Sequence, residues 1–300
     1  MKRILTLCLG IVSSSAFAGV TPWLDFTLEN GHVKVPTTVS GIPSKAILDT
    51  GAQMNGINPR FINKNELDLD KGGKTRVRGV YGVEDKATYN NVPINLFGME
   101  TTINDAVEIN LGHHENSLLF GAGFFRQFVM QLDYPNQKMR LITHDALDLS
   151  KMKNIKMEKQ KGSGMPIVEV ELSEGKSIWL ILDTGNNGGM VVNRNVARKM
   201  GWIENIDRES QISRGATTSA VTETFRIPWL KFGPFEMENV QVSIPDEGET
   251  ANLRSQFATT NTRIKGRNVE GLIGYDVLKH FLITIDYRRG NAHIGLPEES

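Results

Sequence analysis

The sequence predicts an all-β protein with only a few short helices, built from two similar lobes. Short apolar runs at residues 168–172, 240–244 and 282–285 alternate or continue without a break, and turn residues separate them. Several stretches of the first half recur in the same order in the second half. Two similar halves can pack about a pseudo-twofold axis, so we expect one lobe over residues 19–150, a linker over 151–164 and a second lobe over 165–300.

The most informative repeat is the tripeptide Asp-Thr-Gly, at residues 49–51 and again at 183–185. Each copy follows an apolar run, which predicts a buried strand that ends in a turn. An ionised Asp at such a position needs hydrogen bonds or a partner. Glycine permits close backbone approach there, and the threonine hydroxyl can reach the opposite turn. One such tripeptide is commonly an ordinary surface turn, but two in matching contexts could place Asp49 and Asp183 face to face.

The residues after each tripeptide also correspond. Asn58 precedes Pro59, and Asn193 precedes a segment that closes at Gly201, so each predicts a short helix with an asparagine cap. Further on, each half carries an apolar pair followed by glycine, with phenylalanine seven residues and Asp-Tyr twelve residues after that glycine. These registers predict a short helix and then a strand that ends in a turn.

Together these motifs resemble those of the aspartic peptidase superfamily, in particular the bacterial retropepsin-like and pepsin-like aspartyl proteases that carry both lobes in one chain. The family motif is apolar-apolar-Asp-Thr/Ser-Gly with a later apolar-apolar-Gly in each lobe, which here is residues 119–121 and 272–274. The resemblance implies a double β-barrel with pseudo-twofold symmetry, a peptide or protein substrate, and neither a metal nor a cofactor. It implies that Asp49 and Asp183 are catalytic, and that the supporting residues are Thr50, Gly51, Thr184 and Gly185.

The sequence departs from the pepsin-like pattern directly after each glycine. A hydroxyl residue usually follows there and bonds the carboxylate, whereas this chain has Ala52 and Asn186. Two adjacent carboxyls hold one proton between them, because both cannot ionise cheaply. Without the two hydroxyls the ionised form loses stabilising contacts, so we expect activity at mildly acidic to near-neutral pH. The open run 186–189 also raises the question of how firmly the second turn is held.

A lid over the pair is predicted in the first lobe. Residues 76–83 alternate charged and apolar side chains around glycines, as a β-hairpin flap would. Tyr81 and Gly82 are therefore the candidate flap residues, and the alternative is an ordinary hairpin with an exposed aromatic ring. Residues 213–218 lie at a comparable offset in the second lobe, lack an aromatic residue, and carry no catalytic prediction.

The first 18 residues have the three parts of a secretory signal peptide: a basic start, an apolar run over residues 4–12 and the small-x-small site 16–18. We expect cleavage after Ala18 and a periplasmic or secreted protein. The only cysteine, Cys8, lies in this segment. The apolar run is too short to span a bilayer, so no stable membrane insertion is expected once it is removed.

Composition and residue spacing argue against several other kinds of function. Lys plus Arg and Asp plus Glu both total 34, which leaves no basic surface for nucleic acid. His113 and His114 lack the further ligands that a metal site needs, and the glycine-rich stretches lack dinucleotide-binding spacing. Residues 246–268 read as a long polar insertion. We expect a monomer that is either a secreted aspartic endopeptidase or a non-catalytic peptide-binding member of the same fold.

Overall fold

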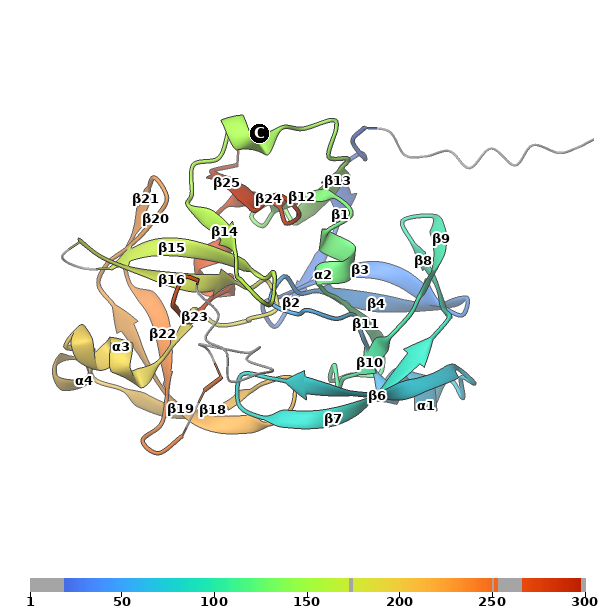
Figure 1. The fold of residues 1–300 in the computed structure, drawn as a ribbon, viewed down its shortest axis with the longest axis horizontal. Coiled ribbons are helices and arrows are strands. Elements are labelled where there is room, and N and C mark those ends of the chain that lie inside the picture. Colours follow the sequence, from blue (N-terminus) through green and yellow to red (C-terminus); the bar gives the residue numbers. More distant parts are fainter. Residues whose placement is uncertain (1–18, 173–174, 250, 253–265, 298–300) are drawn as a thin grey trace, which may run out of the picture.

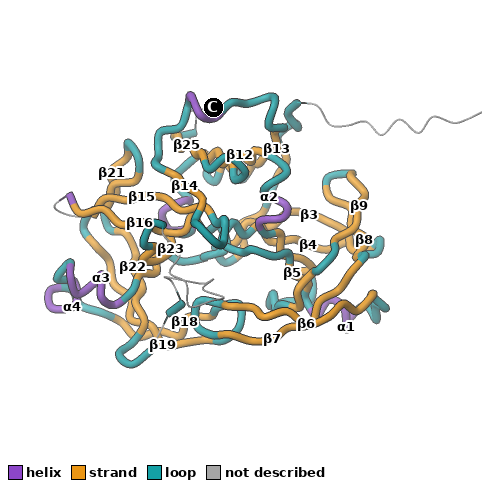
Figure 2. The backbone as a smooth tube through the Cα atoms, viewed as in Figure 1, coloured by secondary structure: helices purple, strands orange, loops and turns teal. Residues whose placement is uncertain are grey.

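The computed structural model describes residues 19–172, 175–249, 251–252 and 266–297. Strands dominate this part of the chain, and its helices are five short α-helices and one 3-10 turn (Figure 2). The prediction of an all-β fold with few helices is confirmed. The expected signal peptide, residues 1–18, lies outside the described residues, as does most of the insertion predicted at 246–268.

The first lobe is a curled ten-stranded sheet, seen toward the right in Figure 1. Its strands run in the order β6-β7-β10-β5-β11-β4-β3-β8-β9, with β2 paired to β3. Their bounds are β2 (Thr27–Glu29), β3 (His32–Val39), β4 (Ile42–Leu48), β5 (Gly56–Ile57), β6 (Asp70–Arg78), β7 (Val83–Asn90), β8 (Val92–Leu96), β9 (Met99–Ile103), β10 (Ala106–Glu108) and β11 (Asn116–Phe120).

The second lobe repeats this arrangement strand for strand, toward the left in Figure 1. The order is β18-β19-β22-β17-β23-β16-β15-β20-β21, with β14 paired to β15. Their bounds are β14 (Met157–Lys159), β15 (Pro166–Leu172), β16 (Lys176–Leu182), β17 (Met190–Val192), β18 (Glu209–Arg214), β19 (Ser219–Ile227), β20 (Leu230–Phe232), β21 (Phe235–Met237), β22 (Val240–Pro245) and β23 (Val269–Ile273). The two lobes thus share one strand order, in agreement with the repeat in the sequence.

The expected linker, residues 151–164, contains a strand, β14. This strand pairs antiparallel with β15, with Met157 opposite Val168, and Met157 is buried. Ile155 is also buried and bridges Ala292, so the segment is attached to the second half of the chain at more than one point.

A third sheet of five strands is shared by both halves of the chain and lies above the two curled sheets in Figure 1. At its centre β12 (Val129–Asp133) pairs antiparallel with β24 (Leu282–Asp286). The outer strands are β1 (Leu24–Asp25) and β13 (Lys138–Ile142) on one side and β25 (Asn291–Gly295) on the other. Buried apolar side chains from both lobes and from this sheet form one continuous core.

The helices are α1 (Pro59–Lys64), α2 (Ala122–Phe125), α3 (Arg194–Lys199), α4 (Trp202–Asn205) and α5 (Tyr275–Leu278), with a 3-10 turn at Leu149–Lys151. The two predicted caps differ. The side chain of Asn58 accepts a hydrogen bond from Arg60 N, as a cap should. Asn193 makes no such bond, because its side chain donates to Glu270 O at 3.2 Å.

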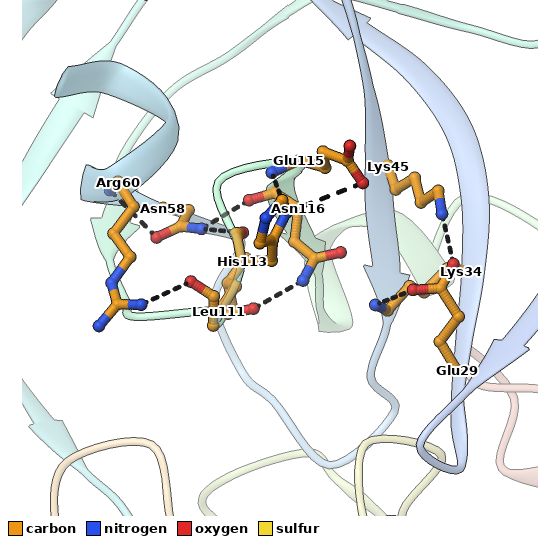
Figure 3. Close-up of polar contacts among 10 residues, drawn as sticks. Glu29, Lys34, Lys45, Asn58, Arg60, Leu111, His113, Glu115 and Asn116 are labelled. Carbon is orange, nitrogen blue, oxygen red and sulfur yellow. Dashed lines mark hydrogen bonds and ion pairs between the residues drawn. The ribbon is translucent and has the colours of Figure 1, made fainter. Parts of the chain in front are cut away.

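Asn58 also holds the loop that contains the two histidines (Figure 3). Its Nδ2 donates to His113 O at 3.0 Å and to Asn116 O at 2.7 Å. Glu115 lies 3.7 Å from Nδ1 of His113 on the exposed side of this loop. On the neighbouring strands, Glu29 pairs with both Lys34 and Lys45, and these hydrogen bonds lower the pKa of Glu29 to about 2. The cluster is a scaffold for β3, β4 and β11.

Candidate active site

Each Asp-Thr-Gly turn stands at the end of a strand that a parallel neighbour supports. β4 pairs in parallel with β11, and Asp49 N donates to Phe120 O at 3.0 Å. β16 pairs in parallel with β23, and Asp183 N donates to Ile273 O at the same distance. The later apolar-apolar-Gly segments therefore lie beside the aspartates, as the repeat predicts.

The two threonines lock the turns to each other. Thr50 Oγ1 donates to Leu182 O at 2.6 Å, and Thr184 Oγ1 donates to Leu48 O at 2.8 Å. Each hydroxyl also accepts from the other threonine's backbone N–H at 3.0 Å. Both threonines are buried, 0% and 1% exposed. Four reciprocal hydrogen bonds in a buried setting make a rigid joint between the lobes.

The glycines allow the carboxyls to approach. A Cβ added to Gly51 would lie 2.5 Å from Asp183 Oδ1, and one added to Gly185 would lie 2.5 Å from Asp49 Oδ1. Any side chain at either position would overlap the carboxyl of the opposite lobe. The structure therefore brings Asp49 and Asp183 together across the pseudo-twofold axis, with all six residues singled out in the sequence at one place.

The electrostatics of the pair are unequal. Burial raises the pKa of Asp49 most, and the negative charge of Asp183 and hydrogen bonding between the two carboxyls raise it further. Burial also raises the pKa of Asp183, but hydrogen bonds from Asp49 and from backbone N–H groups oppose that rise. Gly185 N and Asn186 N donate to Asp183 Oδ1 at 2.9 and 3.2 Å. Asp49 Oδ1 is buried and finds no partner within the described residues.

These environments favour one ionisation state. Backbone N–H bonds stabilise a carboxylate as an anion. Gly51 and Ala52 lower the pKa of Asp49 in this way, but burial and the charge of Asp183 raise it more. The pair therefore holds one proton, and the larger rise in pKa favours Asp49 as its site. Because the groups interact strongly, they titrate as a unit rather than as two independent acids.

Asn186 does not replace the missing hydroxyl at the carboxylate. Its side chain braces the glycine run instead: Nδ2 donates to Gly189 O at 2.7 Å and Oδ1 accepts from Gly188 N at 3.1 Å. Its own carbonyl accepts from Tyr275 N at 2.9 Å. The second turn is therefore held by side-chain bonds, which the sequence alone left open.

Two hairpins, one from each lobe, meet between the lobes on the lower side of Figure 1. β6 and β7 form the hairpin predicted around Tyr81, and β18 and β19 form its counterpart. Tyr81 Oη and Ser213 Oγ lie 2.9 Å apart. Added Cβ atoms on Gly79 and Gly82 would lie within 2.7 Å of Thr217 and Thr218, respectively. Tip residues of the two hairpins are thus in direct contact.

A third segment joins this contact. Asn252 N donates to Val80 O at 2.6 Å, and Asn252 Nδ2 donates to Gly79 O at 3.2 Å. Val80 also packs against a buried apolar cluster of the second lobe that includes Ile181 and Leu272. Sequence reasoning noted the stretches 213–218 and 246–268 but assigned no role to Ser213 or Asn252, because their partners are defined only when the two lobes are assembled.

The comparison with protein families bears on this arrangement. The aspartyl protease family model matches residues 35–124 and 168–277, which contain both Asp-Thr-Gly turns and together make up more than half of the chain. The chain belongs to the aspartyl protease family. This membership supports a protease-type function and agrees with the two-lobed all-β fold. A search of the curated proteins found no match.

Other site types were sought in the part of the chain that the structure describes. There, no group of three or more His, Cys, Asp or Glu residues is placed to hold a metal ion. No helix in the same described part is long and apolar enough to cross a membrane.

Proposed function

We propose that this member of the aspartyl protease family is an endopeptidase that hydrolyses peptide bonds with a water molecule activated by Asp49 and Asp183. The observation that carries the proposal is the pair of carboxyls held face to face by the reciprocal Thr50 and Thr184 hydrogen bonds. Thr50, Gly51, Thr184 and Gly185 act as the supporting residues.

The unequal carboxyls divide the chemistry. Ionised Asp183 takes a proton from the attacking water, and the water oxygen forms a bond to the carbonyl carbon of the substrate. Asp49 gives its proton to the carbonyl oxygen, so the tetrahedral intermediate is neutral. A proton then passes from the pair to the amide nitrogen as the C–N bond breaks. One hydroxyl of the intermediate returns its proton to the pair as the carbonyl re-forms, so the products are a carboxylic acid and an amine and the pair is again singly protonated.

The rigid joint between the lobes contributes to this step. Proton transfer by a positioned side chain typically supplies about 10²–10⁴-fold in rate. Fixed orientation of the reacting groups adds to it, and a displacement of about 1 Å is enough to cost roughly 100-fold. The threonine bonds hold the two turns to one geometry, which is the reason for placing them in the catalytic machinery.

Tyr81 and Gly82 belong to the lid in this proposal. A lid that meets its counterpart from the other lobe encloses a bound peptide and excludes water. Opening requires separation of Tyr81 from Ser213 and of Asn252 from Val80. Tyr81 therefore helps to hold the two hairpin tips together.

The setting of the enzyme is also part of the proposal. Signal-peptide cleavage after Ala18 would release a periplasmic or secreted monomer whose partner is a peptide or protein substrate. Equal numbers of basic and acidic residues support the absence of a nucleic-acid partner. N-terminal sequencing of protein recovered from the producing cell tests the cleavage site, and a first residue other than Gly19 would contradict it.

The decisive experiment incubates the mature protein with a mixed peptide library between pH 3 and 8, alongside Asp49→Asn and Asp183→Asn. We expect cleavage by the wild type, with a maximum at mildly acidic to near-neutral pH, and none by either variant. Equal cleavage by all three would refute the catalytic pair. Retention of peptides by all three without cleavage would instead identify the non-catalytic peptide-binding member.

A further inference from the structure

Two buried tyrosines occupy equivalent positions in the halves of the chain. Tyr134 directly follows β12, and Tyr287 directly follows β24. They are 2% and 1% exposed. Neither hydroxyl has a hydrogen-bond partner among the described residues. A buried hydroxyl that is left unpaired is costly and uncommon, and phenylalanine would fill the same space without that cost. The duplicated hydroxyl therefore requires an explanation other than packing.

Each tyrosine packs against an aromatic residue of the segment that supports the Asp turn of the opposite half. The ring of Tyr134 lies 6.3 Å from that of Tyr275, whose backbone N donates to Asn186 O just after Asp183. The ring of Tyr287 stacks on Phe125 of α2 at 6.1 Å.

Helix α2 completes the second connection. It begins at Ala122, whose N donates to Ala52 O just after Asp49. Tyr134, from the first half of the chain, is thus linked through Tyr275 to the Asp183 turn. Tyr287, from the second half, is linked through α2 to the Asp49 turn, so the two links cross.

The charges around the two hydroxyls place both of them in the field of the aspartate pair. Burial raises the pKa of Tyr134, and the negative charge of Asp183 raises it further, with Tyr275 as the other titratable neighbour. Burial also raises the pKa of Tyr287; Asp49 and Asp183 add to the rise, and the positive charge of Arg126 opposes it. Arg126 sits 5.9 Å from the centre of the Tyr287 ring.

The rise in each tyrosine pKa reflects repulsion between a carboxylate and an ionised tyrosine, whereas the neutral hydroxyls meet the same carboxylates as dipoles. A hydroxyl dipole orients in the local field, so an O–H group without another acceptor turns its hydrogen toward the nearest negative charge. A hydrogen turned toward a carboxylate stabilises the ionised form and lowers the pKa of the acid. The two hydroxyls would then replace part of the stabilisation that Ala52 and Asn186 do not provide beside the carboxylates.

We propose that Tyr134 and Tyr287 are positioning residues whose hydroxyls stabilise the negative charge of the aspartate pair. This inference rests on the proposed function for its role in catalysis. Its physical content is the effect of the two hydroxyls on the ionisation of Asp49 and Asp183. That effect is measurable without a substrate.

The experiment follows the carboxyl carbons of the aspartates by ¹³C NMR as a function of pH in the wild type, in Tyr134→Phe, in Tyr287→Phe and in the double variant. The double variant should ionise its aspartate pair at a pH higher by about 0.5 to 1 unit. Each single variant should show part of this shift. Because the hydroxyls lack protein partners, the melting temperature should stay the same or rise.

Tyr89→Phe is the matched control. Tyr89 is also buried, but its hydroxyl donates to Glu108 at 3.2 Å. Its removal should leave the titration of the pair unchanged. If peptides are cleaved, the acidic limb of the rate profile should move with the NMR titration in the tyrosine variants and stay in place in the control.

The outcomes separate the two proposals. An unchanged titration in the double variant overturns the inference, and so does a fall in melting temperature without a titration shift, which indicates a purely structural role. A shifted titration in a protein that cleaves no peptide supports the inference and counts against the proposed endopeptidase.

Discussion

Removal of one hydroxyl at the joint between the lobes should unfold the protein at lower temperature and abolish its activity. Thr50→Val keeps the shape of the side chain and deletes Oγ1. Two buried groups, Leu182 O and Thr184 N, then lose the partner that now lies at 2.6 and 3.0 Å. Each buried polar group left unpaired costs about 1–3 kcal/mol, so the free energy of unfolding should fall by about 2–6 kcal/mol.

Urea and thermal unfolding of the wild type and Thr50→Val measure this loss, with Thr50→Ser as the matched control. At roughly 2–4 °C per kcal/mol for a chain of this size, the Tm of the valine variant should fall by at least about 4 °C. Thr50→Ser keeps the hydroxyl and removes one methyl group, which costs only about 1 kcal/mol. If the valine variant proves as stable as the serine variant, the joint does not hold the lobes as described.

Three further predictions concern the aspartates and the lid. The pKa of Asp49 is raised on folding. Its contribution therefore stabilises the folded state below the unfolded pKa of about 3.9 and is lost as pH rises through the folded pKa. Asp49→Asn should raise Tm at pH 7 and leave it unchanged at pH 3. Gly185→Ala should eliminate peptide cleavage in a folded protein, because its Cβ would overlap the Asp49 carboxyl; wild-type cleavage rates would contradict the close approach. Tyr81→Phe removes the bond to Ser213 and should cost no more than about 1.5 kcal/mol of stability, while amide hydrogen exchange at the hairpin tips becomes faster; unchanged exchange there would argue against a joined lid.

Much of the site could be predicted from the sequence because its residues sit in a duplicated local pattern. An apolar strand that ends in Asp-Thr-Gly defines the turn by itself, and the second copy at Asp183 supplies the partner for Asp49. The equal spacing from each later glycine to Asp-Tyr likewise gave the short helix and the strand that follows it. Because the pattern occurs twice, each copy supports the structural interpretation of the other.

Other contacts could not be predicted because their partners are set by the assembly of the lobes. Asn193 occupies a cap position, yet its side chain bonds Glu270 O, which is distant along the chain. Asn252 reaches the tip of the first hairpin from the second lobe. The unpaired hydroxyls of Tyr134 and Tyr287 are also invisible in sequence, since satisfaction of a buried polar group depends on everything packed around it.

The sheet shared by the two halves has a consequence for how this chain can be divided. β12 and β24 are each other's neighbours, so a gene cut between the lobes would yield two products, each with an uncovered central strand. Uncovered strand edges recruit other strands, and a two-fold pairing of identical halves would satisfy the same edge. In the single polypeptide the two halves are always present together and in equal number. Separate halves would have to meet by diffusion, so formation of the shared sheet would depend on the concentration of each.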